Sequence, residues 1–144
     1  MSTQPVTVRV TRKFSQSPER VFDAFLHAGT ARRFLFATEH GEMVRAELVP
    51  LVGGVFIFTD RRAGEDVDHC GQYLVIERPH RLVFDFGVPA HDPLRAEVAI
   101  AIEADGAGCV LTLTQAMPAK FAEYAERTQH GWTMILGNLA KALS

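Results

Sequence analysis

Six histidines are the residues of this sequence best suited to acid–base or metal chemistry, namely His27, His40, His69, His80, His91 and His130. They show neither the H-x-x-x-H nor the H-E-x-x-H spacing that places two metal ligands on one helix face. The sequence also lacks a Gly-x-Ser-x-Gly segment, and Gly53-Gly54 has no lysine beside it and is better explained as a hairpin turn than as a phosphate loop. We therefore predict no metal, no cofactor and no catalytic residue.

Two histidines have neighbours that suggest a further interpretation. His69 lies in an extended segment beside Asp66 and Asp68, where it is either a polar or acid–base group inside a pocket or an exposed strand residue. His91-Asp92 stands in a loop that contains two prolines and is either a gate at a pocket mouth or a solvated pair. The residues alone leave both alternatives open.

Aromatic side chains recur at alternate positions in two segments. Residues 71–86 contain two runs rich in Val, Ile, Leu, Tyr and Phe, on either side of a turn that contains a proline. The second run places Phe84 and Phe86 on one side of a strand, as an earlier segment does with Phe56 and Phe58. A sheet face with four phenylalanines must be covered by another layer. Whether the covered space is a solid core or a pocket decides what the protein can do.

Hydrophobic alternation and turn residues predict seven strands. They span residues 6–14, 43–49, 55–60, 67–77, 82–86, 94–103 and 109–115. Between the first two strands, Ser17-Pro18-Glu19 starts a short helix that Gly29 ends. Thr30 can cap a second short helix over residues 31–36.

A long helix completes the predicted order of elements. It opens at Pro118 and ends near Leu143, with Trp132, Ile135 and Leu139 in an apolar stripe that covers about one third of its circumference. This order predicts an α+β fold with a single antiparallel sheet. A straight helix of about 25 residues spans roughly 37 Å and cannot follow a sheet of seven strands that twists and curls. We therefore expect a hollow between the sheet and the helix, with the two short helices at one end.

Size and composition are those of one soluble domain. The 144 residues are 47% hydrophobic and 22% charged, and a formal net charge of −2 favours neither nucleic acid nor an anionic membrane. No apolar run approaches the roughly 18 residues of a membrane helix, and the N-terminus does not resemble a secretory signal. Cys70 and Cys109 lack a C-x-x-C spacing and are expected to be free thiols. We expect a single cytoplasmic domain over residues 1–144, without nucleic-acid or membrane partners.

Five segments carry a resemblance to a known family: 17–25, 53–58, 71–73 with 81–86, 111–114, and Gly131-Trp132 with Leu136 and Leu139. Together they resemble the START-like superfamily (helix-grip, Bet v 1-like), and specifically the family related to the C-terminal domain of the activator of the Hsp90 ATPase. The resemblance implies a helix-grip fold, in which a curved seven-stranded antiparallel sheet, two short helices after the first strand and a long C-terminal helix enclose a cavity. It implies no single function, because the superfamily includes lipid carriers, plant hormone and allergen proteins, and aromatase/cyclases.

The preferred hypothesis is non-enzymatic binding of a small hydrophobic or aromatic molecule in that cavity. The residues expected to bind the ligand are Phe34, Phe56, Phe58, His69, Tyr73, Phe84, Phe86, Arg95, Thr128, Trp132 and Ile135. The alternative is a cyclase- or hydrolase-like enzyme for an aromatic or polyketide-type compound, with His69 or Tyr73 as acid or base and Arg95 stabilising negative charge. A chaperone-associated accessory role is implied by the resemblance alone, and a homodimer is left open.

Three positions depart from the family pattern. Many relatives carry Trp at the end of the second short helix and of the central hairpin, where this chain has Phe34 and Phe86. Gln115 stands where relatives usually have His after the Leu-Thr pattern of the last strand. If these positions hold ligand in the relatives, the ligand of this chain is expected to differ.

Overall fold

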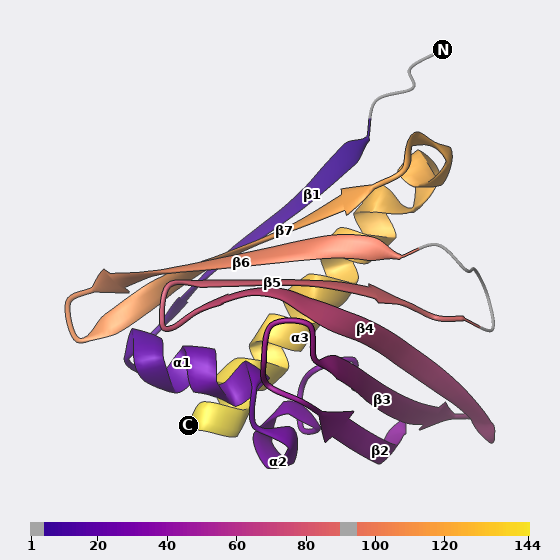
Figure 1. Cartoon of the computed structure of the whole chain (residues 1–144), viewed down its shortest axis with the longest axis horizontal. Coiled ribbons are helices and arrows are strands. Elements are labelled where there is room, and N and C mark those ends of the chain that lie inside the picture. The colour runs from indigo at the N-terminus through magenta and orange to yellow at the C-terminus, as the bar shows by residue number, and fades with distance from the viewer. Residues whose placement is uncertain (1–4, 90–94) are drawn as a thin grey trace.

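Seven strands form one antiparallel sheet in a computed structural model that describes residues 5–89 and 95–144. The strands are β1 (Val6–Phe14), β2 (Glu42–Leu48), β3 (Val55–Arg62), β4 (Glu65–Glu77), β5 (Arg81–Gly87), β6 (Ala96–Asp105) and β7 (Gly108–Met117). Their order across the sheet is β1-β7-β6-β5-β4-β3-β2, so the first strand lies beside the last one (Figure 1). The predicted fold class and strand count are confirmed.

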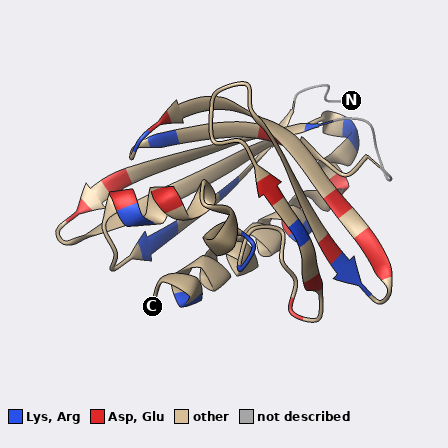
Figure 2. Cartoon of the chain, turned by 60° about the horizontal axis from the view of Figure 1, so that its bottom comes forward, with Lys and Arg blue, Asp and Glu red and all other residues tan. Residues whose placement is uncertain are grey.

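Alternation along the strands separates a buried face from an exposed one. In β7, for example, Leu111, Leu113 and Gln115 are buried while the threonines between them are partly exposed. The buried faces of the central strands meet the helices and form the core. Acidic and basic residues are interspersed over the strands and helices (Figure 2).

Two short helices follow β1 and fill one end of the fold. α1 (Pro18–Phe25) begins as predicted, because the Ser17 hydroxyl accepts a hydrogen bond from the Arg20 N–H at 3.2 Å. The second short helix is present as predicted, but its predicted bounds and N-cap were wrong. α2 (Ala28–Ala31) is shorter and starts earlier, and Gly29 lies inside it. His27, not Thr30, is its N-cap, because the imidazole accepts a hydrogen bond from the Thr30 N–H at 3.3 Å.

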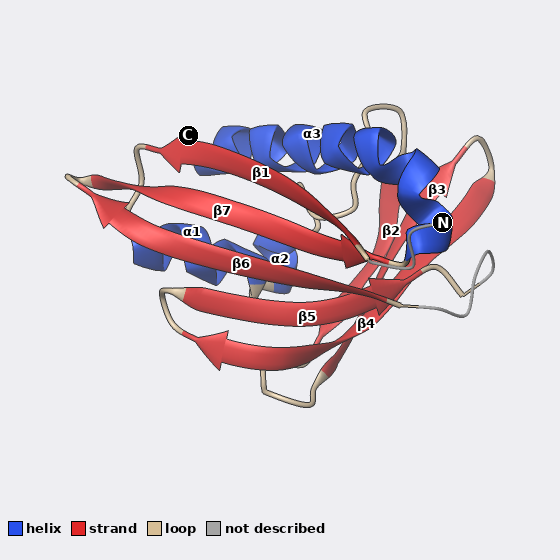
Figure 3. Ribbon diagram, turned by 90° about the horizontal axis from the view of Figure 1, so that it is seen from above, coloured by secondary structure: helices blue, strands red, loops and turns tan. Residues whose placement is uncertain are grey.

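The C-terminal helix packs across the buried face of the sheet (Figures 1 and 3). Its first turns form a 3₁₀ helix (η1, Ala119–Tyr124), and the α-helix proper is α3 (Ala125–Leu143). Pro118 therefore precedes a 3₁₀ segment rather than opening the α-helix. No helix of the described residues is long and apolar enough to cross a membrane.

The expected hollow does not run along the whole of α3. Leu136, Leu139 and Leu143 are buried against side chains of the sheet and of α1, among them Phe22 and Phe25. These phenylalanines and leucines form part of the buried core between α1, α3 and the sheet. An opening remains beside the middle of α3, where Gly131, Met134 and Ile135 line it.

Candidate functional site

A cluster of six aromatic rings lies between α3 and the sheet. Phe36 is at its centre, and we call the group the aromatic cluster: Phe36, Phe56, Phe58, His69, Phe86 and Trp132. The ring of Phe36 stacks on the imidazole of His69, with centroids 4.5 Å apart and an angle of 11° between the planes. Its centroid is 4.9 Å from that of Phe86 and 5.8 Å from that of Trp132. Rings at these separations contribute packing energy beyond their buried area.

An opening of about 240 Å³ leads from the surface to this cluster. It lies between the segment after α2, the facing ends of β3 and β4, and α3. Its lining residues are Phe36, Ala37, Thr38, Arg62, His69, Gly131, Met134 and Ile135. Four of these side chains are apolar and three are polar, and sites that hold small molecules combine the two kinds in this way.

His69 is a neutral, buried histidine at the inner wall of the opening. The residue is 6% exposed, and its Nδ1 lies 3.3 Å from the carbonyl oxygen of Phe58. Burial lowers the pKa of His69 to about 4, and the nearby Arg62 guanidinium contributes in the same direction. The ring is therefore uncharged at neutral pH. Because a carbonyl oxygen only accepts, Nδ1–H donates here and Nε2 is left as an acceptor.

Polar residues of β3 hold the segment that follows α2. The carboxylate of Asp60, 0% exposed, accepts hydrogen bonds from the Thr38 hydroxyl at 2.7 Å and from Arg62 Nε at 2.8 Å. Arg62 Nη2 donates in addition to the backbone oxygen of Phe36 at 3.3 Å. Asp60 Oδ1 has no hydrogen-bond partner among the described residues. One ion pair thus fixes the rim of the opening and leaves one buried acceptor unsatisfied.

Tyr73 carries a second unpartnered polar atom into the interior. Its side chain is buried on the same face of β4 as His69, and its ring lies 5.3 Å from that of Phe56. The hydroxyl has no partner among the described residues, and burial raises the pKa of Tyr73. A buried hydroxyl without a partner carries a desolvation cost. It is the kind of group that a bound molecule or water would satisfy.

The structure brings most of the predicted ligand-binding residues to one face but not to one cavity. His69 and Ile135 line the opening. Trp132, Phe56, Phe58, Phe84 and half-buried Phe86 form the packed wall behind it, with Tyr73. Thr128 is half-buried one turn before Trp132 on α3.

Two predicted residues lie elsewhere. Phe34 packs edge-on against Phe25 of α1, with centroids 5.1 Å apart. Arg95 is exposed and pairs with Asp85 at 3.1 Å. Asp85 is on the opposite face of β5 from Phe84 and Phe86, so Arg95 does not join His69 and Tyr73. The proposed gate at His91-Asp92 lies outside the described residues.

Most residues of the site were missed by the sequence analysis, among them Phe36, Asp60 and Arg62. Asp60 and Arg62 continue the inward alternation of Phe56 and Phe58 along β3, and that signal could have identified them. Phe36 was assigned to a helix, and no periodicity in the sequence indicates that it turns inward.

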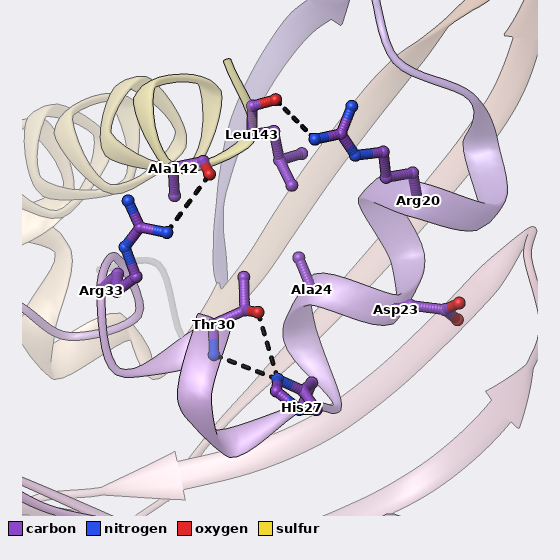
Figure 4. Close-up of a pocket in the computed structure, with 8 residues that line it drawn as sticks. All are labelled: Arg20, Asp23, Ala24, His27, Thr30, Arg33, Ala142 and Leu143. Carbon is purple, nitrogen blue, oxygen red and sulfur yellow. Dashed lines mark hydrogen bonds between the residues drawn. The ribbon is translucent and has the colours of Figure 1, made fainter.

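A larger hollow, of about 370 Å³, lies at the C-terminal end of α3 (Figure 4). There Arg20 Nη2 donates to the carbonyl of Leu143 at 2.9 Å, and Arg33 Nη1 donates to that of Ala142 at 3.5 Å. These side chains satisfy carbonyls that a helix end leaves unpaired and lie at the negative end of its dipole. The hollow is best explained as a joint between α1, α2 and α3, and the opening beside the aromatic cluster is the better candidate site.

The described residues contain no group of three or more His, Cys, Asp or Glu side chains placed to hold a metal ion. Cys109 is buried, Cys70 is half-buried, and both thiols are free.

Comparison with known proteins assigns the family. The model described as "Activator of Hsp90 ATPase homolog 1-like protein" matches residues 15–144. The chain belongs to this family. The resemblance inferred from the five sequence segments is therefore confirmed. A comparison with curated proteins finds no match.

Solved structures of similar fold come from several bacteria. A protein from Chromobacterium violaceum has 24% sequence identity and a TM-score of 0.81, with 95% of this chain and 96% of that chain covered. An AHSA1-like protein from Aeromonas hydrophila has 19% identity, a TM-score of 0.81 and coverage of 96% and 92%. A protein of unknown function from Staphylococcus aureus has 14% identity, a TM-score of 0.85 and coverage of 99% and 95%. At these identities the likeness shows the AHSA1-like fold and no activity.

Proposed function

We propose that this AHSA1-like domain binds a small hydrophobic or aromatic molecule at the opening between α3 and the sheet, without catalysing a reaction. The observation that carries the proposal is the opening itself, which reaches the aromatic cluster and is bordered by a neutral, buried His69. Apolar surface removed from water there contributes roughly 25 cal/mol per Å². The bound molecule would displace water from the accessible apolar side chains of the lining, such as Met134 and Ile135.

Few polar groups are available to orient the ligand. Thr38 and Arg62 lie at the rim, and His69 lies deeper. The hydroxyl of Tyr73 is further inside, behind the ring of Phe56. An apolar body with one or two polar atoms fits this distribution better than a highly charged metabolite does.

The enzymatic alternative is weakened by the placement of its proposed residues. Its acid or base was His69 or Tyr73, but burial lowers the pKa of His69 to about 4 and raises that of Tyr73, so neither group is tuned to exchange a proton near neutral pH. Arg95 is engaged with Asp85 on the other face of the sheet. A chaperone partner, a homodimer and a cytoplasmic location stay predictions.

Two glycines of α3 provide a matched pair for testing the site. A side chain at Gly131 would meet no atom within 4 Å at its Cβ position, and Gly131 lines the opening. Gly137 has equal room but lines a different hollow, together with Glu39, Asn138 and Lys141. For any compound that raises the melting temperature of the wild type, we expect Gly131→Leu to weaken binding by roughly tenfold or more. A steric conflict that costs about 1.4 kcal/mol of binding free energy already gives a tenfold loss of affinity.

Gly137→Leu is expected to leave that affinity unchanged, and titration calorimetry measures both variants. Both substitutions replace a helical glycine and should not lower stability. Equal binding by Gly131→Leu and wild type would place the ligand elsewhere and contradict the proposed site. A broad thermal-shift screen of apolar and aromatic compounds that finds no ligand would contradict the proposed function.

A further inference from the structure

The ring of Phe36 occupies the part of the site that a ligand would find most favourable. It is 4% exposed and contacts five aromatic side chains, from β3, β4, β5 and α3. At the same time it forms part of the wall of the opening. Phe36 is not part of a regular element, since it follows α2 in a run of turns. One side chain from a connecting segment thus fills the centre of the aromatic cluster.

The backbone of Phe36 is in an unfavourable conformation. Its φ angle is +61°, in the left-handed region. Apart from glycine, only Ala63 shares a positive φ among the described residues, and Ala63 lies in the exposed turn between β3 and β4. A large side chain adopts this conformation only where its surroundings impose it. Residues with such strained backbones are found most often at binding sites and in switch regions. Here the contacts of the Phe36 ring with the five other aromatic rings hold the backbone in this conformation.

The hydrogen bonds made by the backbone of residues 36 and 37 are long. The Phe36 carbonyl accepts from Arg62 at 3.3 Å, and the Ala37 N–H donates to the Phe34 carbonyl at 3.4 Å. The shorter anchor is the Thr38 hydroxyl on Asp60, at 2.7 Å. Rotation at residues 36 and 37 would therefore withdraw the ring while Thr38 stays attached, and it would release one Arg62 N–H.

We propose that Phe36 is an intramolecular stand-in for the ligand, and that the ligand is a flat, single-ring aromatic compound with a neutral hydrogen-bond acceptor. This inference rests on the proposed function. The ligand ring takes the place of the Phe36 ring against the flat face of His69. Its acceptor takes the Arg62 N–H that the Phe36 carbonyl gives up. The acceptor is neutral because Arg62 is already paired with the carboxylate of Asp60, which repels an anion.

Displacement of Phe36 reduces the affinity of the wild type, because only the fraction of molecules with the ring withdrawn can bind. Removing the ring removes this penalty. We expect Phe36→Ala to bind acetophenone roughly tenfold or more tightly than the wild type in titration calorimetry. Phe34→Ala is the matched control, since it truncates a buried phenylalanine two positions earlier that packs on Phe25 away from the opening. It should bind as the wild type does.

The chemical class is tested with a matched compound. Cyclohexyl methyl ketone has the acceptor of acetophenone on a ring that is not flat, and it should bind Phe36→Ala at least several-fold more weakly. Equal affinities for the two ketones would overturn the assignment to flat rings. Equal or weaker binding of acetophenone by Phe36→Ala than by wild type would overturn the displacement of Phe36.

A measurement on the wild type covers the case in which Phe36→Ala does not fold. Trp132 is the sole tryptophan, so its indole signals are assigned without ambiguity, and its ring is 5.8 Å from that of Phe36. Nuclear Overhauser effects between the two rings should disappear when acetophenone saturates the protein. A screened compound that binds while these effects persist overturns the role of Phe36 and leaves the proposed function standing. Binding of no compound by the wild type or by Phe36→Ala overturns both.

Discussion

Replacement of Trp132 by alanine is expected to lower the free energy of unfolding by about 3–5 kcal/mol, the range for a buried tryptophan or phenylalanine. Trp132 is 3% exposed and holds α3 to the sheet in two ways. Its ring lies against Phe36 and Phe86, and its indole N–H donates to the Gln115 side-chain oxygen at 2.5 Å. Truncation removes the packing and leaves a buried acceptor on β7 without a donor. Urea unfolding measures the loss.

Two further variants separate packing from hydrogen bonding. Trp132→Phe keeps an aromatic ring but removes the donor, and it should cost about 1–3 kcal/mol from the unsatisfied Gln115. Adding Gln115→Leu to that variant should recover part of the loss. Met134→Ala, at a side chain 43% exposed two residues further along α3, should stay within about 0.5 kcal/mol of the wild type. A loss below about 1 kcal/mol for Trp132→Ala would mean that this residue does not anchor the helix.

Acidification from about pH 7 to about pH 5 is expected to remove about 2 kcal/mol of stability through His69 alone. Its pKa is about 4 in the folded protein and 6.5 in the unfolded chain. Between these values the unfolded chain binds a proton at residue 69 and the folded protein does not, so falling pH favours unfolding. Below about pH 4 the folded form is protonated as well, and the effect of this residue levels off. Arg62 opposes protonation of His69, and Asp60 favours it.

His69→Phe keeps a flat ring beside Phe36 and removes the titration. The pH dependence of its unfolding free energy should be smaller than that of the wild type by about 2 kcal/mol over the same range. His130→Gln, at an exposed position on α3, should behave as the wild type does. An unchanged pH dependence in His69→Phe would show that the imidazole is not held neutral by burial.

The fold could be predicted from the sequence because its strands alternate cleanly and its helix has a single apolar face. Leu111 and Leu113 on β7 and Leu136 and Leu139 on α3 all lie in the core, as their spacing indicates. Local capping was less predictable. Thr30 suits a helix start by residue type and His27 does not, and only the hydrogen bond between them shows that His27 takes that role.

The site could be predicted only in outline. Alternation along β4 places His69 and Tyr73 on the inner face, but whether that face is packed or open depends on segments far away in the sequence. Phe36 comes from a turn and reaches the centre of the cluster through a left-handed backbone, which no hydrophobic pattern encodes. Arg95 was wrongly predicted as a ligand-binding residue. Its residue type suits a binding site, but its side chain pairs with Asp85 on the other face of the sheet.

Intermolecular nuclear Overhauser effects from a bound compound test the central proposal most directly. The compound is the best ligand from the thermal-shift screen, and the protein is the wild type. We predict contacts to the methyl groups of Ile135 and to the ring protons of His69, both of which line the opening. Contacts confined to Ala99 and Thr114, which line a hollow on the outer face of the sheet, would contradict the proposed binding site.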